Sequence, residues 1–358
     1  MREIPGLIKV AALLWCGLMS MSTLHAQDAH FTQFYASPLL LNPALTGAFD
    51  GQLRASAIYR DQWRGVVENP FVTTSASLDF RFPVELGGRD NGDAASAGIT
   101  FMNDRVRVFD FTHNQITASG AFHKMLDRNT NQILSGGLQI GIGQRNVNYA
   151  NLSFEDEFTI GPGGTSGYTG TTRENLPTNN ITFFDFGAGV NYSYAPRSGP
   201  GFYAGVSAFH INQPDISFFA RDDETVVEEL LDMRITAHAA AVIPTSSTIS
   251  VQPRALVHLQ GESLQALLGS SVRFQVDAFS STAFHVGSWV RGVKNIDGFG
   301  ADAVVALLGF EYNNVLLGTS YDIGVSDFTA GARGRGALEI SLAYLGNYEN
   351  DSLLCPQF

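Results

Sequence analysis

The chain has 358 residues, of which 34 are acidic and 22 are basic, so its formal net charge is −12. A chain this acidic offers no basic face for phosphates, and we therefore expect no nucleic-acid partner. It has only two cysteines, Cys16 and Cys355, which excludes a cysteine-rich metal site, and we expect no metal and no cofactor.

The first 26 residues are typical of a secretory signal peptide. Arg2 and Lys9 give a basic start, the apolar run Val10–Met19 follows, and residues 24–26 form a cleavage site. The alternative, a membrane anchor, is disfavoured because this run is too short to span a bilayer. We therefore predict export, with cleavage after Ala26.

Residues 27–52 precede the first expected strand and are unusually apolar for a processed N-terminus. Pro38 and Pro43 prevent a continuous helix and would interrupt a strand ladder. We expect an extended segment with local turns that packs into or against the periplasmic mouth of the domain that follows. The side chains expected to be buried there are Phe31, Phe34, Tyr35 and Leu39–Leu41. Two roles stay open, a plug that only stabilises that domain or a docking site for a partner.

From residue 53 onward, apolar and polar side chains alternate, as they do in strands with two different faces. In residues 72–82, for example, positions 72, 76, 78, 80 and 82 are apolar, whereas Asp79 and Arg81 lie on the other face. The sequence predicts fourteen such strands, at residues 53–60, 72–82, 95–104, 111–124, 131–147, 181–195, 201–212, 233–244, 247–260, 263–276, 282–293, 299–312, 315–327 and 337–348.

These strands predict an all-β fold, and the two candidates are a soluble β-sandwich and an antiparallel outer-membrane β-barrel. The even number of strands, their length and the predicted export favour the barrel. Aromatic pairs such as Tyr192 and Tyr194 end the apolar faces, as in the girdles of barrels that face lipid. We therefore predict a transmembrane barrel over residues 53–348, followed by a periplasmic tail at 349–358.

The lengths of the connections indicate which end of the barrel faces outward. The long connections 148–180 and 213–232 are both odd-numbered, whereas several even-numbered ones are tight turns. Barrels of this kind have short periplasmic turns and longer external loops, so we expect both termini in the periplasm. In the second long loop, Val226, Val227, Leu230 and Leu231 recur at helical spacing, which predicts a short amphipathic helix over the mouth, as a lid or a docking surface.

Glycines at positions 136, 137, 141 and 143 lie within one predicted strand. A phosphate-binding loop would need a helix directly after them. We therefore interpret them as sites of close backbone approach or bending.

Alternation places many charged side chains on the lumen face. They are Arg54, Arg60, Arg81, Arg145, Arg234, Arg254, Arg273, Arg291, Asp79, Asp185, Asp322 and Glu339. This set is either an ion-pair network that makes the barrel rigid or a selectivity ring for anions, and the acidic members favour the network. Four histidines, His123, His238, His258 and His285, also face inward, but none is spaced to pair with a nucleophile, so we expect no enzyme and no catalytic residue.

Two stretches of the chain resemble signatures of the PorP/SprF family of Bacteroidota membrane proteins. In the first, "QDAHFTQFYASPLLLNPALTGAF", the matching positions are Asp28, Phe31, Gln33, Phe34, Pro38, Asn42, Pro43, Ala44 and Gly47. The second, "YRDQW", contributes Tyr59, Arg60, Gln62 and Trp63. The late stretches "YDIGVSD" (321–327), "GALEISLAY" (336–344) and "CPQF" (355–358) are also similar to that family's ending.

The resemblance implies a non-enzymatic outer-membrane protein that serves type IX secretion and, in gliding species, surface adhesins. It implies three kinds of contact: lipid of the outer membrane, a secreted adhesin or its C-terminal sorting domain, and periplasmic lipoproteins of the secretion machinery. The motif positions become candidate docking residues. The leading hypothesis is a barrel that docks or anchors such partners, and the alternative is a general porin for small solutes.

Overall fold

A computed structural model describes residues 28–65, 70–85, 92–107, 110–127, 132–160, 166–174, 176–196, 198–219, 229–277, 282–295, 298–325 and 336–346. The predicted signal peptide (1–26) and C-terminal tail (349–358) lie outside these residues. No helix among the described residues is long and apolar enough to cross a membrane.

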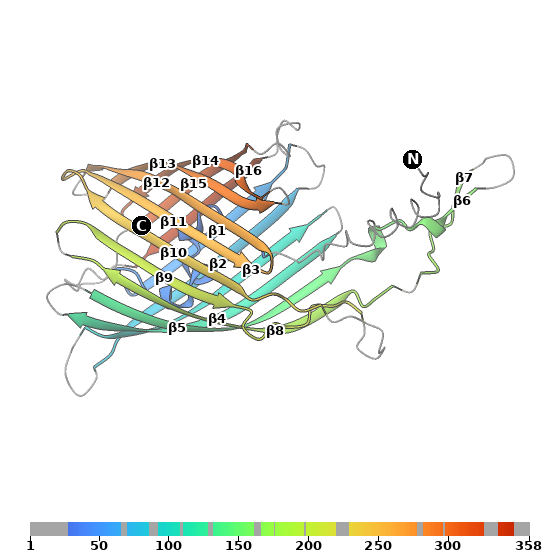
Figure 1. Ribbon diagram of the computed structural model, residues 1–358, viewed down its shortest axis with the longest axis horizontal. Helices are drawn as coiled ribbons and strands as arrows, with labels where there is room; N and C mark the ends of the chain where they lie inside the picture. The colour runs from blue at the N-terminus through green and yellow to red at the C-terminus, as the bar shows by residue number, and fades with distance from the viewer. Residues whose placement is uncertain are drawn as a thin grey trace, which may run out of the picture.

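Fourteen described strands pair with their neighbours to form one closed antiparallel barrel, as predicted (Figure 1). The last strand pairs with the first, so the sheet has no open edge. The strands are β1 (Leu53–Gln62), β2 (Phe71–Pro83), β3 (Ala94–Val106), β4 (Phe111–Asp127), β5 (Gln132–Val147), β8 (Asn180–Tyr194), β9 (Gly201–Phe209), β10 (Arg234–Pro244), β11 (Ile249–Gln260), β12 (Ser263–Asp277), β13 (Thr282–Asn295), β14 (Gly298–Tyr312), β15 (Val315–Gly324) and β16 (Gly336–Leu345).

The strand bounds agree with the predicted ones to within a few residues. The clearest difference is β9, which ends at Phe209 although alternation continues to residue 212. The next residue, His210, has φ of +55° and Gln213 has φ of +41°. Side chains other than glycine rarely adopt this left-handed conformation, and a strand cannot continue through it.

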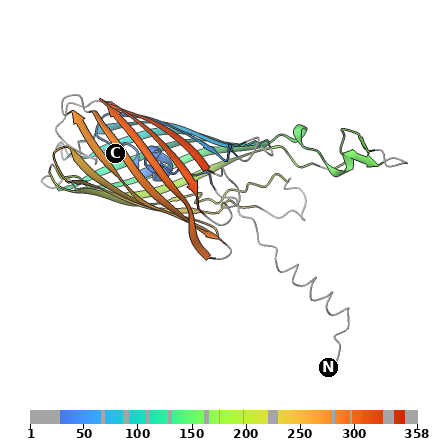
Figure 2. The same ribbon diagram turned by 90° about the horizontal axis from the view of Figure 1, so that it is seen from above.

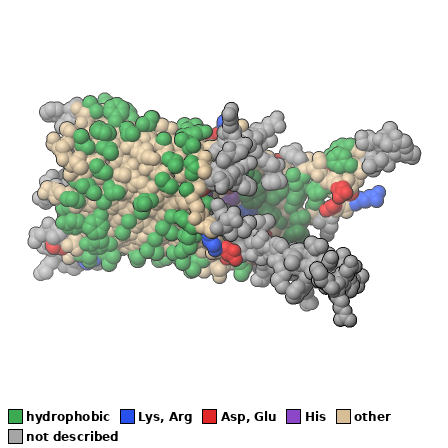
Figure 3. Space-filling view, turned by 45° about the horizontal axis from the view of Figure 1, so that its top comes forward, with side chains coloured by type: hydrophobic (Ala, Val, Ile, Leu, Met, Phe, Trp, Pro, Cys, Tyr) green, Lys and Arg blue, Asp and Glu red, His purple; other side chains and the backbone are tan. Residues whose placement is uncertain are grey.

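The outer face of the wall is apolar, as a lipid-facing surface requires. On β5, Leu138 is 69% exposed, whereas its neighbour Gln139 points into the lumen and is 4% exposed. Hydrophobic side chains cover the outer wall between its two rims (Figure 3). The alternation read from the sequence therefore separates the lipid face from the lumen face.

The two ends of the barrel differ. We call the end that carries the turns 195–200, 245–248 and 313–314 the short-turn end, and the opposite end the long-loop end. At the long-loop end, the connection between β5 and β8 forms an arm (described residues 148–160, 166–174 and 176–179). It contains η3 (Tyr149–Asn151), η4 (Glu155–Glu157) and a small sheet of β6 (Phe158–Ile160) and β7 (Ser166–Tyr168), which lies beyond the barrel (Figure 1).

The second long connection, between β9 and β10, folds over the long-loop end. The N–H of Ile216 donates to Glu229 and that of Leu231 donates to Pro214, and Ile216 and Leu231 pack on Phe183 of β8. Residues 220–228, which include Val226 and Val227 of the predicted helix, lie outside the described residues. The other two residues of that prediction, Leu230 and Leu231, are in an extended antiparallel pairing instead.

Residues 28–52 lie inside the barrel, and we call them the plug (Figure 2). They form three short turns, η1 (Phe34–Ala36), α2 (Pro38–Leu41) and η2 (Pro43–Leu45). Pro38 and Pro43 each begin a turn, where a missing N–H is tolerated. The prolines therefore start local turns where the sequence predicts them, but residues 34–45 are mostly in short helices and not extended as expected.

The plug runs the length of the lumen, which differs from the expected position at one mouth. The N–H of Asp28 donates to Gln260 at the long-loop end of β11, and the carbonyl of Phe49 accepts from Arg81 near the short-turn end of β2. Polar groups along the whole lumen need partners. The plug has many backbone groups that are not paired within it, and these provide hydrogen-bond partners along the whole lumen.

The apolar side chains of the plug are buried, as predicted. Of the six side chains predicted to be buried, Phe31, Phe34, Tyr35, Leu39 and Leu41 are buried and Leu40 is half-buried. The plug packs on an apolar patch of the lumen wall made by Leu256, Leu267, Trp289, Val305 and Leu307.

Candidate functional site

One buried carboxylate, that of Glu339 on β16, holds the plug against the wall. Its two oxygens accept hydrogen bonds from the consecutive backbone N–H groups of Thr32 (2.7 Å) and Gln33 (2.8 Å). Arg60 on β1 donates to the same carboxylate, and Glu339 is fully buried. Because an unpaired buried charge is very unfavourable, the carboxylate, the guanidinium and the plug backbone hold one another in place.

A second carboxylate extends this contact to neighbouring strands. Asp322 on β15 accepts hydrogen bonds from Thr32 Oγ1 at 2.9 Å, Arg60 Nη2 at 3.1 Å and Arg291 Nη1 at 2.6 Å. Arg291 on β13 also donates through Nε to Asp302 on β14 at 2.9 Å. We call this set the Glu339 network. Its members are Thr32, Gln33, Arg60, Arg291, Asp302, Asp322 and Glu339.

Nearer the short-turn end, Asp79 on β2 binds the plug in a similar way. Arg54 donates to its two oxygens through Nε (3.0 Å) and Nη2 (2.7 Å), and the Gly47 N–H donates at 2.7 Å. Gly47 has φ of +69°, and a Cβ there would lie 2.3 Å from Ser96 Cβ. The motif glycine is therefore required both by its backbone conformation and by the space available.

The middle of the plug contacts β5, β8 and β10. The fully buried Asn42 donates through Nδ2 to the carbonyl of Val190 at 3.0 Å, and the same nitrogen lies 3.1 Å from His238 Nε2. A Cβ on Gly137 would lie 2.4 Å from the carbonyl carbon of Pro43. Close backbone approach, predicted from the glycine cluster, is therefore confirmed at Gly137.

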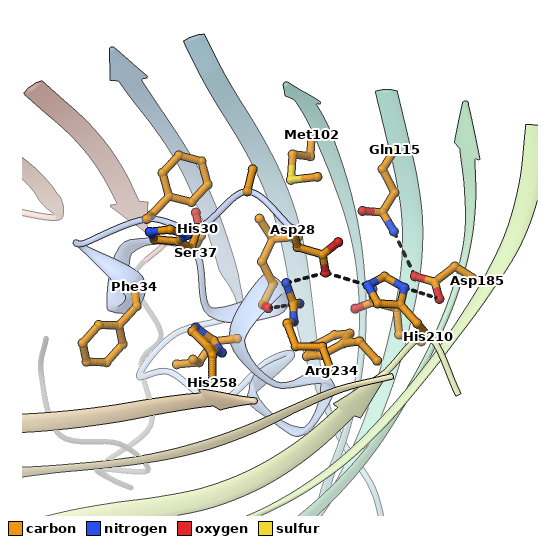
Figure 4. A pocket seen from close by; sticks show the side chains of 16 residues that line it. Asp28, His30, Phe34, Ser37, Met102, Gln115, Asp185, His210, Arg234 and His258 are labelled. Carbon is orange, nitrogen blue, oxygen red and sulfur yellow. Dashed lines mark hydrogen bonds and ion pairs between the residues drawn. The ribbon is translucent and has the colours of Figure 1, made fainter. Parts of the chain in front are cut away.

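At the long-loop end, the first described residue of the plug joins a chain of charged groups (Figure 4). Asp28 Oδ2 lies 2.6 Å from His210 Nε2 and 2.9 Å from Arg234 Nη1. The other ring nitrogen of His210 lies 2.9 Å from Asp185 Oδ1 on β8. Gln115 on β4 donates to the second oxygen of Asp185 at 3.0 Å.

The other apolar motif residues of the plug, Phe31, Phe34, Pro38, Pro43 and Ala44, are buried within it. The second signature lies on β1 and just beyond it, and of its members Arg60 binds the plug. Tyr59 donates to Asp61, Gln62 accepts from Arg60 at 3.4 Å, and Trp63 packs edge-on against Phe71. The partners of these three residues are therefore other residues of the wall near the long-loop end, and not the plug.

The remaining predicted lumen arginines contact the plug, an aromatic ring or a carboxylate. Arg81 donates to the plug at Phe49, and the Arg254 guanidinium lies 4.2 Å from the ring centre of Tyr35. Arg145 lies over the ring of Phe183. Arg273 donates twice to Glu311, which His285 also contacts. Of these four arginines, Arg273 makes an ion pair, whereas the contacts described above for the other three are with a backbone carbonyl or an aromatic ring.

Sequence reasoning missed four residues of the site, Thr32, His210, Asp302 and Glu311. Thr32 lies within the first signature, and its role depends on the path of the plug. Glu311 has the same strand parity as the buried Ala303 and Val305, so alternation indicated its direction. No local pattern marked His210 or Asp302, because their partners come from distant parts of the chain.

Comparison with known proteins gives the family. Residues 23–344 match the family described as type IX secretion system membrane protein PorP/SprF. The chain belongs to this family. The resemblance found in the sequence is therefore confirmed over nearly the whole chain, and the protein is an outer-membrane barrel of a secretion-system family.

No curated protein matches the chain. Among solved structures, it is similar to the CymD monoaromatic hydrocarbon channel, with 9% identity over 90% of this chain and 96% of that one, and a TM-score of 0.48. It is also similar to a Pseudomonas aeruginosa FadL homologue, with 11% identity over 85% of this chain and 92% of that one, and a TM-score of 0.46. These values are too low to support an inference about function.

The family and the fold are those of a secretion-system membrane barrel. Within the described residues, no group of three or more His, Cys, Asp or Glu side chains is arranged to hold a metal ion. Several buried carboxylates of this PorP/SprF-family protein, those of Glu339, Asp322 and Asp79, bond to the plug.

Replacing Glu339 with Gln should loosen the plug. The variant leaves the Arg60 guanidinium without its closest carboxylate and weakens two backbone hydrogen bonds, and breaking a buried pair costs about 3–5 kcal/mol. We expect amide hydrogen exchange over residues 28–37 to become faster by at least about tenfold. Glu311→Gln is the matched control, since Glu311 is bonded to Arg273 and His285. Equal exchange in both variants would contradict the assignment.

The Asp28 end of the plug should depend on pH. Burial lowers the pKa of His210, but the Asp28 and Asp185 carboxylates outweigh it and raise this pKa to about 9. A raised folded-state pKa gives stability that is complete below the unfolded value of about 6.5 and is lost as pH rises through about 9. The melting temperature in detergent should therefore fall between pH 7.5 and 9.5. In His210→Gln it should be lower at pH 7.5 and should lose this slope, and an unchanged slope would refute the prediction.

Proposed function

We propose that this barrel anchors a secreted adhesin, through its C-terminal sorting domain or a neighbouring surface, at the outside of the outer membrane. The short turns then face the periplasm and the long loops face outward, the usual arrangement for bacterial barrels. In this orientation the last strand, β16, ends on the periplasmic side at Leu345, whereas Asp28, the first described residue of the plug, lies at the long-loop end and therefore faces outward, unlike the periplasmic N-terminus expected from the sequence. The family, type IX secretion system membrane protein PorP/SprF, supports it.

The observation that carries the proposal is the arm at the long-loop end. Phe158 and Tyr168 pack against each other there with ring centres 5.4 Å apart, yet they are 57% and 60% exposed. Exposed aromatic pairs are frequent anchors of protein interfaces. This pair lies beyond the barrel, where lipid does not account for its exposure.

The arm has a defined conformation, which a docking surface needs. Asp156 accepts hydrogen bonds from Thr172 Oγ1 at 2.8 Å and from the Arg173 N–H at 2.5 Å. At the base of the arm, Thr178 donates through its N–H and its hydroxyl to the carbonyl of Phe218 in the next loop. The backbone of the arm is thereby held before a partner arrives, which lowers the entropy lost on binding.

The charge of the arm indicates the chemistry of its partner. Glu155 and Asp156 are exposed beside Phe158. Complementary potentials steer association. We infer a partner surface that presents basic side chains around an apolar contact for the two rings.

The plug supports this proposal over the alternative of a general porin. A diffusion porin keeps a water-filled passage, whereas here the plug is bonded to the wall at the long-loop end, the middle and the short-turn end. In the proposed orientation, the plug and the short turns are what periplasmic lipoproteins of the secretion machinery would meet. In this proposal, the buried motif residues hold the plug in place and do not themselves contact the partner.

Replacing both Phe158 and Tyr168 with Ala should weaken attachment of the adhesin. Loss of two interface aromatics is expected to lower the surface-bound adhesin by about tenfold or more, measured by antibody labelling of intact cells. The matched control is Tyr312→Ala, an exposed aromatic at the short-turn end, which should leave labelling unchanged. Normal labelling of the double variant, at equal barrel level, would refute the proposal.

A further inference from the structure

The short-turn end contains a cavity of about 490 Å³ between the plug and the wall. Tyr35 and Pro38 of the plug line one side, and Arg54, Arg273, Ser341 and Leu345 are among the wall residues on the other. Ligand pockets commonly enclose about 300–1,000 Å³. This cavity is therefore large enough for a bound ligand. We call it the short-turn cavity.

The short-turn cavity lies on the side of the lumen opposite β5 and β8. Near the middle of the plug, the backbone of Pro43 comes within close reach of Gly137, and Asn42 is bonded to Val190. These contacts draw the plug toward β5 and β8. The opposite side, along β12, β15 and β16, stays open at the short-turn end.

A second cavity, lined by Asp28, His210 and Arg234, lies at the long-loop half of the plug. The two cavities have no lining residue in common. The short-turn cavity is therefore separate in its lining from the cavity at the long-loop half.

The polar part of the lining contains a buried hydrogen-bond donor that lacks an acceptor. Arg54 is buried and uses Nε and Nη2 on Asp79, and among the described residues its Nη1 has no hydrogen-bond partner. Arg273 likewise uses Nε and Nη2 on Glu311. A guanidinium carries five N–H groups in a planar fork. An oxygen acceptor in the cavity would satisfy Arg54 Nη1, and Arg273 lies on the same lining.

The two acidic side chains of the lining, Glu311 and Asp50, do not supply the missing hydrogen-bond acceptor. Glu311 is already bonded to both Arg273 and His285. Asp50 lies three residues before the start of β1 and interacts electrostatically with Arg81. The remaining lining is apolar or neutral, with Leu316 and Ala343 on the wall.

We propose that the short-turn cavity binds an extended peptide segment of a partner protein that carries an aspartate or glutamate between apolar side chains. The carboxylate would accept hydrogen bonds from Arg54 and Arg273, and the apolar side chains would lie on Tyr35, Pro38 and Leu345. A purely hydrocarbon ligand fits less well, because it would leave Arg54 Nη1 unsatisfied. This inference is independent of the arm, so either can fail without the other.

The test uses the full-length protein purified in detergent and two fluorescein-labelled, amidated peptides, LSDLS and LSNLS. Fluorescence anisotropy should show saturable binding of LSDLS, with LSNLS weaker by at least about tenfold, because charge-assisted hydrogen bonds are the stronger ones. Arg273→Gln should reduce the affinity for LSDLS to that for LSNLS. Equal affinity of the native protein for both peptides would overturn the proposal.

A second pair of variants separates the cavity from binding elsewhere. Ala343→Trp should fill the short-turn cavity and lower the affinity for LSDLS by at least about tenfold. Leu342→Trp is the matched control, since Leu342 directly precedes Ala343 on β16 and faces outward, 49% exposed. It should bind like the native protein. Undiminished binding by a folded Ala343→Trp variant would also overturn the proposal, and Arg273→Gln provides the test if that variant does not fold.

Discussion

The carboxylate of Glu339 is the group on which the rest of the structure depends. A lumen full of charged side chains is stable only if each charge has a partner, because breaking a buried pair costs about 3–5 kcal/mol. Glu339 binds two backbone N–H groups of the plug and the guanidinium of Arg60. Arg60 and Glu339 are also directly opposite each other where β1 pairs with β16. One carboxylate therefore fixes both the plug and the seam at which the barrel closes.

The barrel was predictable because each strand carries its own signal. In β12 the alternation of apolar and polar residues gives the strand, its two faces and nearly its bounds, with no knowledge of its neighbours. The end of β9 was not predictable in this way. His210 turns the chain there with a positive φ, and its imidazole is held by Asp28 and Asp185. Such a turn depends on contacts between distant parts of the chain.

The sequence predicts which charged residues face the lumen better than it predicts which of them contact one another. Arg60, Asp322 and Glu339 are lumen charges by alternation alone, but their grouping around Thr32 requires the closed barrel and the path of the plug. The burial of Phe31 and Tyr35 could be predicted because both side chains are aromatic. The course of the plug along the lumen could not be predicted from these residues. The sequence did contain one indication that the lumen is filled. Leu256, Leu267 and Trp289 are apolar at lumen-facing positions, and they form part of the patch on which the plug packs.

These contacts describe an outer-membrane barrel of the PorP/SprF family whose lumen is occupied by its own N-terminal segment. The most direct test of this account is single-protein conductance in planar lipid bilayers. We expect the native protein to show no steady conductance. A folded variant that lacks residues 28–49 should show a stable ohmic conductance, because the charged lumen would then fill with water. A native protein that conducts as steadily as this deletion variant would contradict the account.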